Sequence, residues 1–175
     1  MMNVFQASAA ELEKLRDKVY EAARHRNESP ERMAAWQEAS RDFFAAYDRL
    51  AFPGGLNREF ELLKVGDPGA IEMAVRFLEA DPWYFRSGYH KADVLKLLRK
   101  LPLTDEQCAR LRDLILDHVR GRPRRETRDF CRFAPKVTNA EFESEVKTIA
   151  QNSNRHAARR AQWVLDCMKS AGKLS

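Results

Sequence analysis

The chain has 175 residues and a formal net charge of +5, with 44% hydrophobic and 33% charged residues. A chain of this length buries about two-thirds of the surface that it exposes when unfolded, which excludes the small proteins that depend on disulfides or metals to fold. Seven Gly and seven Pro are also too few for a collagen-like or low-complexity protein. We expect a single compact domain with well-solvated helix faces.

The opening sequence MMNVFQASAA carries no basic leader and no apolar run of about seven residues or more, so it does not match a secretory signal. No stretch of the sequence is long and apolar enough to span a membrane. The three cysteines, Cys108, Cys131 and Cys167, show no CxxC spacing, which favours reduced thiols over a disulfide framework. We therefore expect a soluble, cytoplasmic protein without a membrane partner.

Residues 1–66 are predicted to form an N-terminal helical hairpin or cap. Ser8 can accept a hydrogen bond at the start of a first helix, in which apolar residues recur every three or four positions. Ser29 followed by Pro30 predicts the start of a second helix, since proline fits the first helical turn. FPGG at positions 52–55 ends that helix, and LNREFELLK predicts a short third one.

A loose internal repeat from residue 67 onward is the strongest pattern in the chain. Segments 67–103, 104–137 and 138–175 each contain a capping residue, an amphipathic helix, a break and a second amphipathic helix, and the last segment adds a short tail. The starts of the segments lie 37 and 34 residues apart. This period predicts stacked hairpins, because one hairpin cannot bury its own apolar face.

Apolar positions of the three second helices correspond when the segments are aligned. LLRKLP at 97–102 aligns with FCRFAP at 130–135 without a gap, and VLDCM from position 164 continues the pattern. The corresponding residues are predicted to form the core between repeats: Val94, Thr127 and Ala161; Leu97, Phe130 and Val164; Leu98, Cys131 and Leu165; Leu101, Ala134 and Met168.

Residues 66–169 resemble the HEAT-like (armadillo-type) family of α-helical repeats. GDPGAIEMAVRFLEAD is similar to the usual first helix of that family, and Arg86, Arg120 and Arg155 match its recurring arginine near each second helix. The resemblance implies an all-α fold, a right-handed α-solenoid of antiparallel helix hairpins with about nine helices in all. It leaves open whether the first 65 residues form a divergent repeat or a cap.

The stretch DPWYFRSGYHK, residues 81–91, concentrates four aromatic residues at a break between helices. Asp81 and Pro82 disfavour continuation of the preceding helix, and Gly88 allows the chain to reverse. The aromatic residues are predicted to pack against the third helix and the next repeat: Trp83, Tyr84, Phe85 and Tyr89. A surface patch for a partner is the alternative.

Positive charge is concentrated between residues 119 and 136, where six Arg and one Lys against two acidic residues give +5, as much as the whole chain. A turn of about 100° per residue places Arg125, Arg128 and Arg132 opposite the predicted core side of their helix. In the HEAT-like family, second helices usually line the concave surface. Stacking of the repeats would add side chains from the neighbouring second helices: Lys96, Arg99, Arg159 and Trp163.

Trp163 falls about 200° from Ala161 and therefore away from the apolar side of its helix. An outward Trp beside Arg has the composition of a protein interface hot spot, unless the tail SAGKLS folds back over it. Together with the six basic residues, Trp163 forms the predicted partner-binding site. Asp129 and Asp166 interrupt this surface, and +5 is modest for a nucleic-acid binder.

No catalytic or cofactor motif is present, since HExxH, GxSxG, P-loop and GxGxxG patterns are all missing. We expect a non-enzymatic protein without a cofactor, a metal or a small-molecule substrate. Its basic concave face would bind an acidic surface of a protein partner, as in an adaptor or a toxin-immunity protein. Non-specific DNA or RNA binding through the same groove is the alternative. Catalysis would need a clustered His or carboxylate in a pocket.

Overall fold

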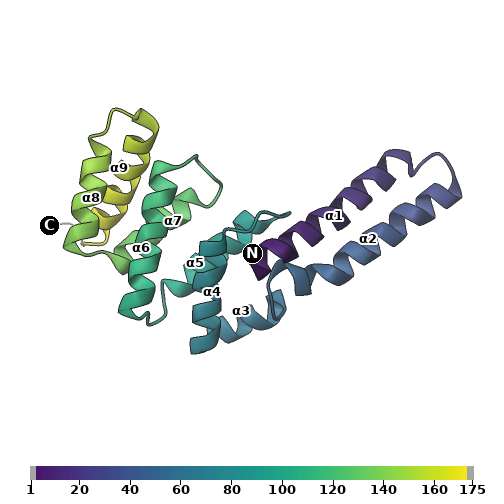
Figure 1. Cartoon of the computed structure of the whole chain (residues 1–175), viewed down its shortest axis with the longest axis horizontal. Coiled ribbons are helices and arrows are strands. Elements are labelled where there is room, and N and C mark those ends of the chain that lie inside the picture. The colour runs from purple at the N-terminus through teal and green to yellow at the C-terminus, as the bar shows by residue number, and fades with distance from the viewer. Residues whose placement is uncertain (1–2, 173–175) are drawn as a thin grey trace. The chain divides into compact units, whose positions relative to one another are not determined.

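The computed structural model describes residues 3–172, and all regular structure in that part of the chain is helical (Figure 1). The expected all-α class is confirmed. The nine helices of the described residues are α1 (Val4–His25), α2 (Pro30–Ala51), α3 (Leu56–Lys64), α4 (Pro68–Ala80), α5 (Ser87–Leu98), α6 (Asp105–Arg120), α7 (Thr127–Val137), α8 (Ala140–Ala150) and α9 (Arg155–Ser170). The outermost residues of the first and last predicted segments, 1–2 and 173–175, lie outside the described part. Between residues 3 and 172, no helix has both the length and the apolar character needed to cross a membrane.

The boundaries of α2 follow the local signals in the sequence. Ser29 accepts a hydrogen bond from a backbone N–H of the first turn, and Pro30 occupies the first helical position. The helix ends at Ala51, and the chain then passes through Gly54 and Gly55 with φ angles of 95° and 96°. Other residues rarely adopt these angles, so the two glycines allow the turn into α3.

Two helices begin at a different residue from the predicted one. The side chain of Asn3 accepts a hydrogen bond from the N–H of Phe5, so Asn3, and not Ser8, caps α1. At α8, Asn139 is the capping residue, one position after the predicted start at Thr138. In each case a nearby asparagine supplies the oxygen that accepts a hydrogen bond from the first turn. Serine and threonine are nearly as favourable as asparagine at this capping position.

The described chain forms two compact units. The first comprises the residues up to Val65 together with Ala80–Ser87, and the second comprises Gly66–Glu79 and the residues from Gly88 onward. The polypeptide therefore passes between the two units three times. In the first unit, α1 and α2 pack against each other as a long antiparallel pair (Figure 1).

Part of the aromatic stretch packs on this antiparallel pair. The buried Tyr84 hydroxyl donates to the carbonyl O of Ala51 at 2.8 Å, and the Tyr47 hydroxyl donates to the carbonyl O of Phe85 at 2.7 Å. Glu13 of α1 accepts a hydrogen bond from the N–H of Phe85 at 3.2 Å. Tyr84 and Phe85 thus join α1 and α2, a packing partner that the sequence did not indicate.

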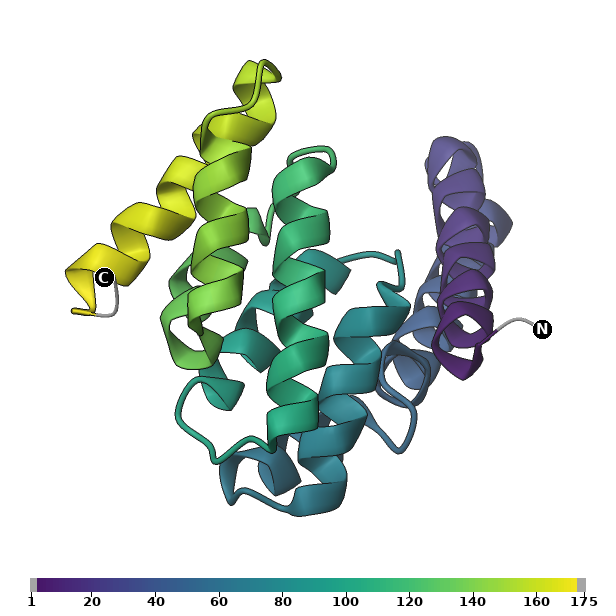
Figure 2. The same ribbon diagram turned by 60° about the vertical axis from the view of Figure 1, so that its left-hand side comes forward.

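The helix pairs α6–α7 and α8–α9 of the second unit pack next to each other. α6 packs on α7 and α8 packs on α9, while α6 also contacts α8 and α7 contacts α9; the green and yellow-green helices in Figure 2 show α6 and α8 side by side. First helices therefore adjoin first helices, and second helices adjoin second helices. The residues predicted to form the core between repeats are buried, except Leu97 and Leu101, which are half-buried.

A buried arginine fixes α9 to the end of α6. Arg160 is 4% exposed, and its Nε donates to the carbonyl O of Val119 at 2.9 Å. A terminal nitrogen of the same guanidinium donates to the carbonyl O of Gly121, the residue that caps α6. Carbonyl groups at the end of a helix have no partner within the helix, so Arg160 satisfies them from α9.

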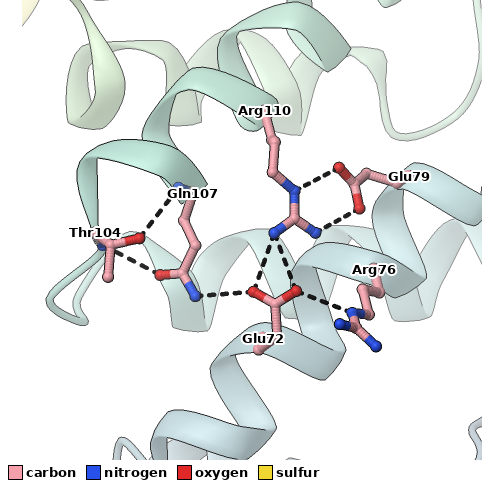
Figure 3. A network of polar contacts seen from close by, with 6 residues as sticks. All are labelled: Glu72, Arg76, Glu79, Thr104, Gln107 and Arg110. Carbon is pink, nitrogen blue, oxygen red and sulfur yellow. Dashed lines mark hydrogen bonds and ion pairs between the residues drawn. The ribbon is translucent and has the colours of Figure 1, made fainter.

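A network of ion pairs joins α4 to α6 (Figure 3). Arg110 donates to the two carboxylate oxygens of Glu79 at 2.7 and 2.6 Å, and to those of Glu72 at 3.0 and 3.1 Å. Partial burial tends to raise the pKa of Glu72, but hydrogen bonds from Gln107, Arg110 and Arg76 outweigh it, so the pKa lies below its ordinary value. The network therefore favours the ionised form of Glu72.

Replacement of Arg110 tests whether this network stabilises the second unit. Arg110→Leu is expected to lower the free energy of unfolding by about 1–2 kcal/mol, because it leaves Glu72 and Glu79 facing each other without their shared cation. Arg76→Leu is the control, since this exposed arginine makes a single pair with Glu72 on the same helix and should cost about 0.5 kcal/mol or less. Urea unfolding monitored by circular dichroism distinguishes the two, and equal losses would contradict a special role for Arg110.

A buried polar cluster lies where α5, α6 and α7 meet. The Nζ of Lys91 lies 3.7 Å from Oε1 of Glu126, and the two side chains are only 3% and 5% exposed. The ring of His118 is buried and stacks on Phe130 with 3.9 Å between the centroids. Burial lowers the pKa of His118 to about 4, although the charge of Glu126 acts in the opposite direction. His118 therefore stays neutral in the folded protein at neutral pH.

The lowered pKa of His118 predicts a loss of stability in mild acid. Its pKa is about 4 when folded against 6.5 ordinarily, so its contribution is fully present above pH 6.5 and is lost as the pH falls towards 4. We expect the free energy of unfolding to fall by about 3 kcal/mol over this interval relative to a His118→Leu variant. NMR titration of the His118 ring provides the direct measurement, and a midpoint near pH 6.5 in the folded protein would contradict the prediction.

Candidate functional site

The residues predicted to bind a partner all lie in the second unit, on or next to its second helices. Lys96 lies in the last turn of α5, Arg99 follows that helix directly, and Arg125 lies two residues before the start of α7. The remaining four are on α7 and α9: Arg128, Arg132, Arg159 and Trp163. The six basic side chains are exposed and Trp163 is half-buried. The predicted outward direction of the basic residues of α7 is therefore confirmed.

Three adjoining hollows connect most of these residues, and Arg132 lines all three. The largest, about 560 Å³, lies between Arg99, Arg132 and Lys136 on one side and the end of α9 on the other. The second, about 310 Å³, reaches Arg128 and Trp163. The third, about 170 Å³, reaches Lys96 and Arg99. We refer to these three hollows together as the basic groove.

Trp163 lies between two arginines at one end of the basic groove. The guanidinium carbon of Arg128, on α7, is 5.1 Å from the centre of the Trp163 ring, and that of Arg159, on α9, is 5.3 Å from it. Such cation–π contacts contribute about 0.5–1 kcal/mol each at exposed sites. They hold the arginines beside an aromatic surface that remains partly accessible. Of the tail that could cover Trp163, residues 173–175 lie outside the described part.

The cations of the basic groove have weaker intramolecular partners than Arg110 has. The guanidinium of Arg132, 61% exposed, lies 3.5 Å from Oδ1 of Asp129, well beyond the 2.7–2.9 Å of a strong charge-assisted hydrogen bond. Lys96 is better paired, since its hydrogen bond to Asp93 at 2.8 Å raises its pKa. Arg99 makes no side-chain ion pair within residues 3–172. The groove therefore keeps cationic groups available to a ligand.

Arg125 is positioned differently from the other predicted residues. Its guanidinium carbon lies 3.4 Å from the centre of the Tyr89 ring on α5, and Tyr89 itself is exposed. Like Arg159, Arg125 lines none of the three hollows of the groove. Its charge acts on Lys96 across the two helices. It thus contributes to the positive potential beside the groove and not to its floor.

Two cysteines on the floor of the basic groove were not singled out by the sequence. Cys131 and Cys167 line the hollow beside Trp163, together with Asp166. Asp166 and Cys167 follow Trp163 by three and four residues on α9, a spacing that places them on the same side of the helix and could have identified them. Burial raises the pKa of Cys131 to about 12 and also raises that of half-buried Cys167. Among the described residues, no cluster of three His, Cys, Asp or Glu side chains is placed to hold a metal ion.

The thiols are expected to differ in reactivity, which gives a probe of the groove floor. In the folded protein at pH 8, iodoacetamide should modify half-buried Cys108 and Cys167 at least about tenfold faster than Cys131, because Cys131 is buried and holds its proton. Mass spectrometry of peptides after timed quenching measures the three rates separately. In 6 M guanidinium chloride the three rates should converge. Comparable rates for Cys131 and Cys167 in the folded protein would contradict this account.

Known proteins supply no relative from which a role for the basic groove could be carried over. The HEAT-like resemblance of residues 66–169 therefore remains an inference from the repeat pattern. No family model matches the chain, and the searches of curated proteins and of solved structures likewise find no match.

Proposed function

We propose that the chain is a non-enzymatic helical-repeat protein whose basic groove binds an acidic surface of a protein partner. The observation that carries the proposal is the meeting of Arg128, Arg132 and Trp163 at one hollow. In this proposal α4–α9 form three HEAT-like hairpins of a right-handed solenoid, with α1–α3 as its cap. The second helices α5, α7 and α9 would then line the concave face.

The composition of the basic groove suits a protein ligand. Arginine offers planar, paired donors that match carboxylates, and both Trp and Arg are enriched among interface hot spots. The ion pair of Arg132 with Asp129 is long, so the Arg132 guanidinium can bind a carboxylate of the partner in place of Asp129. Positive potential from Arg99 and Arg128 would speed the encounter, and contact with Trp163 would slow dissociation. Adaptors and toxin-immunity proteins are the functional classes that use a surface in this way.

Non-specific binding of DNA or RNA is the second candidate function. It is favoured by the excess of guanidinium groups along the basic groove and by the aromatic ring of Trp163 at its end. Binding to phosphates releases counterions and therefore weakens steeply and log-linearly with salt. Binding to a protein through a desolvated Trp is less sensitive to salt, so the salt response distinguishes the two candidates.

Charge reversal in the groove tests the proposed function. The partner is captured on the immobilised chain from a lysate of the source cell, purified, and titrated by isothermal calorimetry against wild type and variants. Arg128→Glu/Arg132→Glu is expected to weaken affinity by about 100-fold, since two attractive contacts become repulsive. Trp163→Ala should weaken it by about 30-fold, the loss typical of a hot-spot residue.

Arg41→Glu/Arg58→Glu is the matched control, because these exposed arginines lie in the first unit and their reversal changes the net charge equally. Its affinity for the captured partner should stay within about twofold of wild type. An unchanged affinity in Arg128→Glu/Arg132→Glu would refute the proposed site. Equal losses in this variant and in the control would show that overall charge, and not the groove, attracts the partner.

A further inference from the structure

We infer that Asp129 and Asp166 determine the specificity of the basic groove, by excluding the continuous phosphate backbone of a nucleic acid while admitting the spaced charges of a protein surface. The inference deepens the proposed function and rests on it. The two aspartates are acidic residues within an otherwise cationic surface. Their negative charge would weaken the binding of any simple polyanion to that surface. Their placement relative to Arg132 carries the argument.

Each of the three hollows that Arg132 lines also contains one of these aspartates. Asp166 lines the two hollows that adjoin α9, and Asp129 lines the third, beside Lys96. An anion that reaches Arg132 from any of the hollows therefore comes close to a carboxylate. Because Arg132 is the residue common to all three, a ligand that follows the groove cannot avoid both aspartates.

The two aspartates are held in place by the fold. The side chain of Asp129 is 17% exposed and lies 3.5 Å from the guanidinium of Arg132, one turn further along α7. Asp166 accepts a hydrogen bond from Gln162 at 2.9 Å on α9. These contacts keep the carboxylates facing the groove. A ligand that enters the groove therefore meets both aspartate side chains.

The two classes of ligand differ in what they can place opposite a carboxylate. A nucleic-acid strand carries a charge at every nucleotide, about 3.4 Å apart along the axis of a duplex strand, and its phosphate oxygens can only accept hydrogen bonds. A protein surface can place an N–H or O–H donor opposite Asp129 and Asp166 and its own carboxylates opposite the arginines. Repulsion of the wrong ligand is a common source of specificity in binding surfaces.

Neutralising the two aspartates is the experiment that tests this inference. Asp129→Asn/Asp166→Asn keeps the shape of both side chains and removes their charge. Fluorescence anisotropy measures binding of a labelled 20-nucleotide single strand and of its duplex, at 50 and 200 mM NaCl. We expect the variant to bind both probes at least tenfold more tightly than wild type at 50 mM, and to lose most of this gain at 200 mM.

Two further variants show whether the gain comes from the groove. Adding Arg128→Glu/Arg132→Glu to the neutralised variant should abolish the gain. Glu106→Gln/Asp113→Asn changes the net charge equally at two exposed residues of α6 that do not line the groove, and should leave binding at the wild-type level. Thermal melts monitored by circular dichroism confirm that each variant is folded.

Three results would overturn the inference. They are equal binding of the probes by wild type and the neutralised variant, no binding by the neutralised variant at 50 mM, and an equal gain in the Glu106→Gln/Asp113→Asn control. Failure of the proposed function is read separately, from the captured partner and the Arg128→Glu/Arg132→Glu variant. Two results together would reject the proposed function while keeping the role of the aspartates. They are tighter nucleic-acid binding by Asp129→Asn/Asp166→Asn, and an unchanged affinity of Arg128→Glu/Arg132→Glu for the captured partner.

Discussion

Each second helix of the second unit is held by burial of one apolar side, and this constraint determines what its opposite side presents. On α7, Phe130 and Ala134 are 1% and 0% exposed, while Arg128 and Arg132 point outward from the same helix. Because the helical period is fixed, the arginines cannot turn inward without exposing the core. Core packing thus determines the outward direction of the side chains that line the basic groove. No additional structural element is needed to hold them in that direction.

Arginines in the second unit fall into two groups according to their partners. Arg110 makes four hydrogen bonds to two carboxylates, and Arg160 is buried against carbonyl groups. Both hold helices together and have little left to offer a ligand. Arg132 and Arg99 are exposed and loosely paired or free of an ion pair within residues 3–172. The extent to which an arginine's donors are already hydrogen-bonded within the protein, more than the number of basic residues, therefore distinguishes structural arginines from candidate binding residues.

The sequence predicted well the features that depend on local chemistry or on helical period. It located α2 from Ser29 and the FPGG turn, and it placed Arg128 and Arg132 on the exposed side of α7. It missed the start of α1, where Asn3 and Ser8 are nearly equivalent caps. Contacts between distant segments were predicted only in part. The repeat alignment placed Trp163 on the same surface as Arg128, whose guanidinium lies over the Trp163 ring. It did not indicate the hydrogen bond of Tyr84 to Ala51, which is 33 residues away in the sequence. Residue spacing within one helix carries no information on such contacts.

The aromatic stretch has a consequence for how the polypeptide can be divided. Ala80–Ser87 belongs to the first unit although the residues on both sides of it belong to the second. The units are therefore interleaved along the chain, and no single cleavage separates them. A fragment beginning at residue 66 would remove α1 and α2 from Tyr84 and expose its buried ring to water. Such a fragment would carry the Ala80–Ser87 segment without the helices on which it packs.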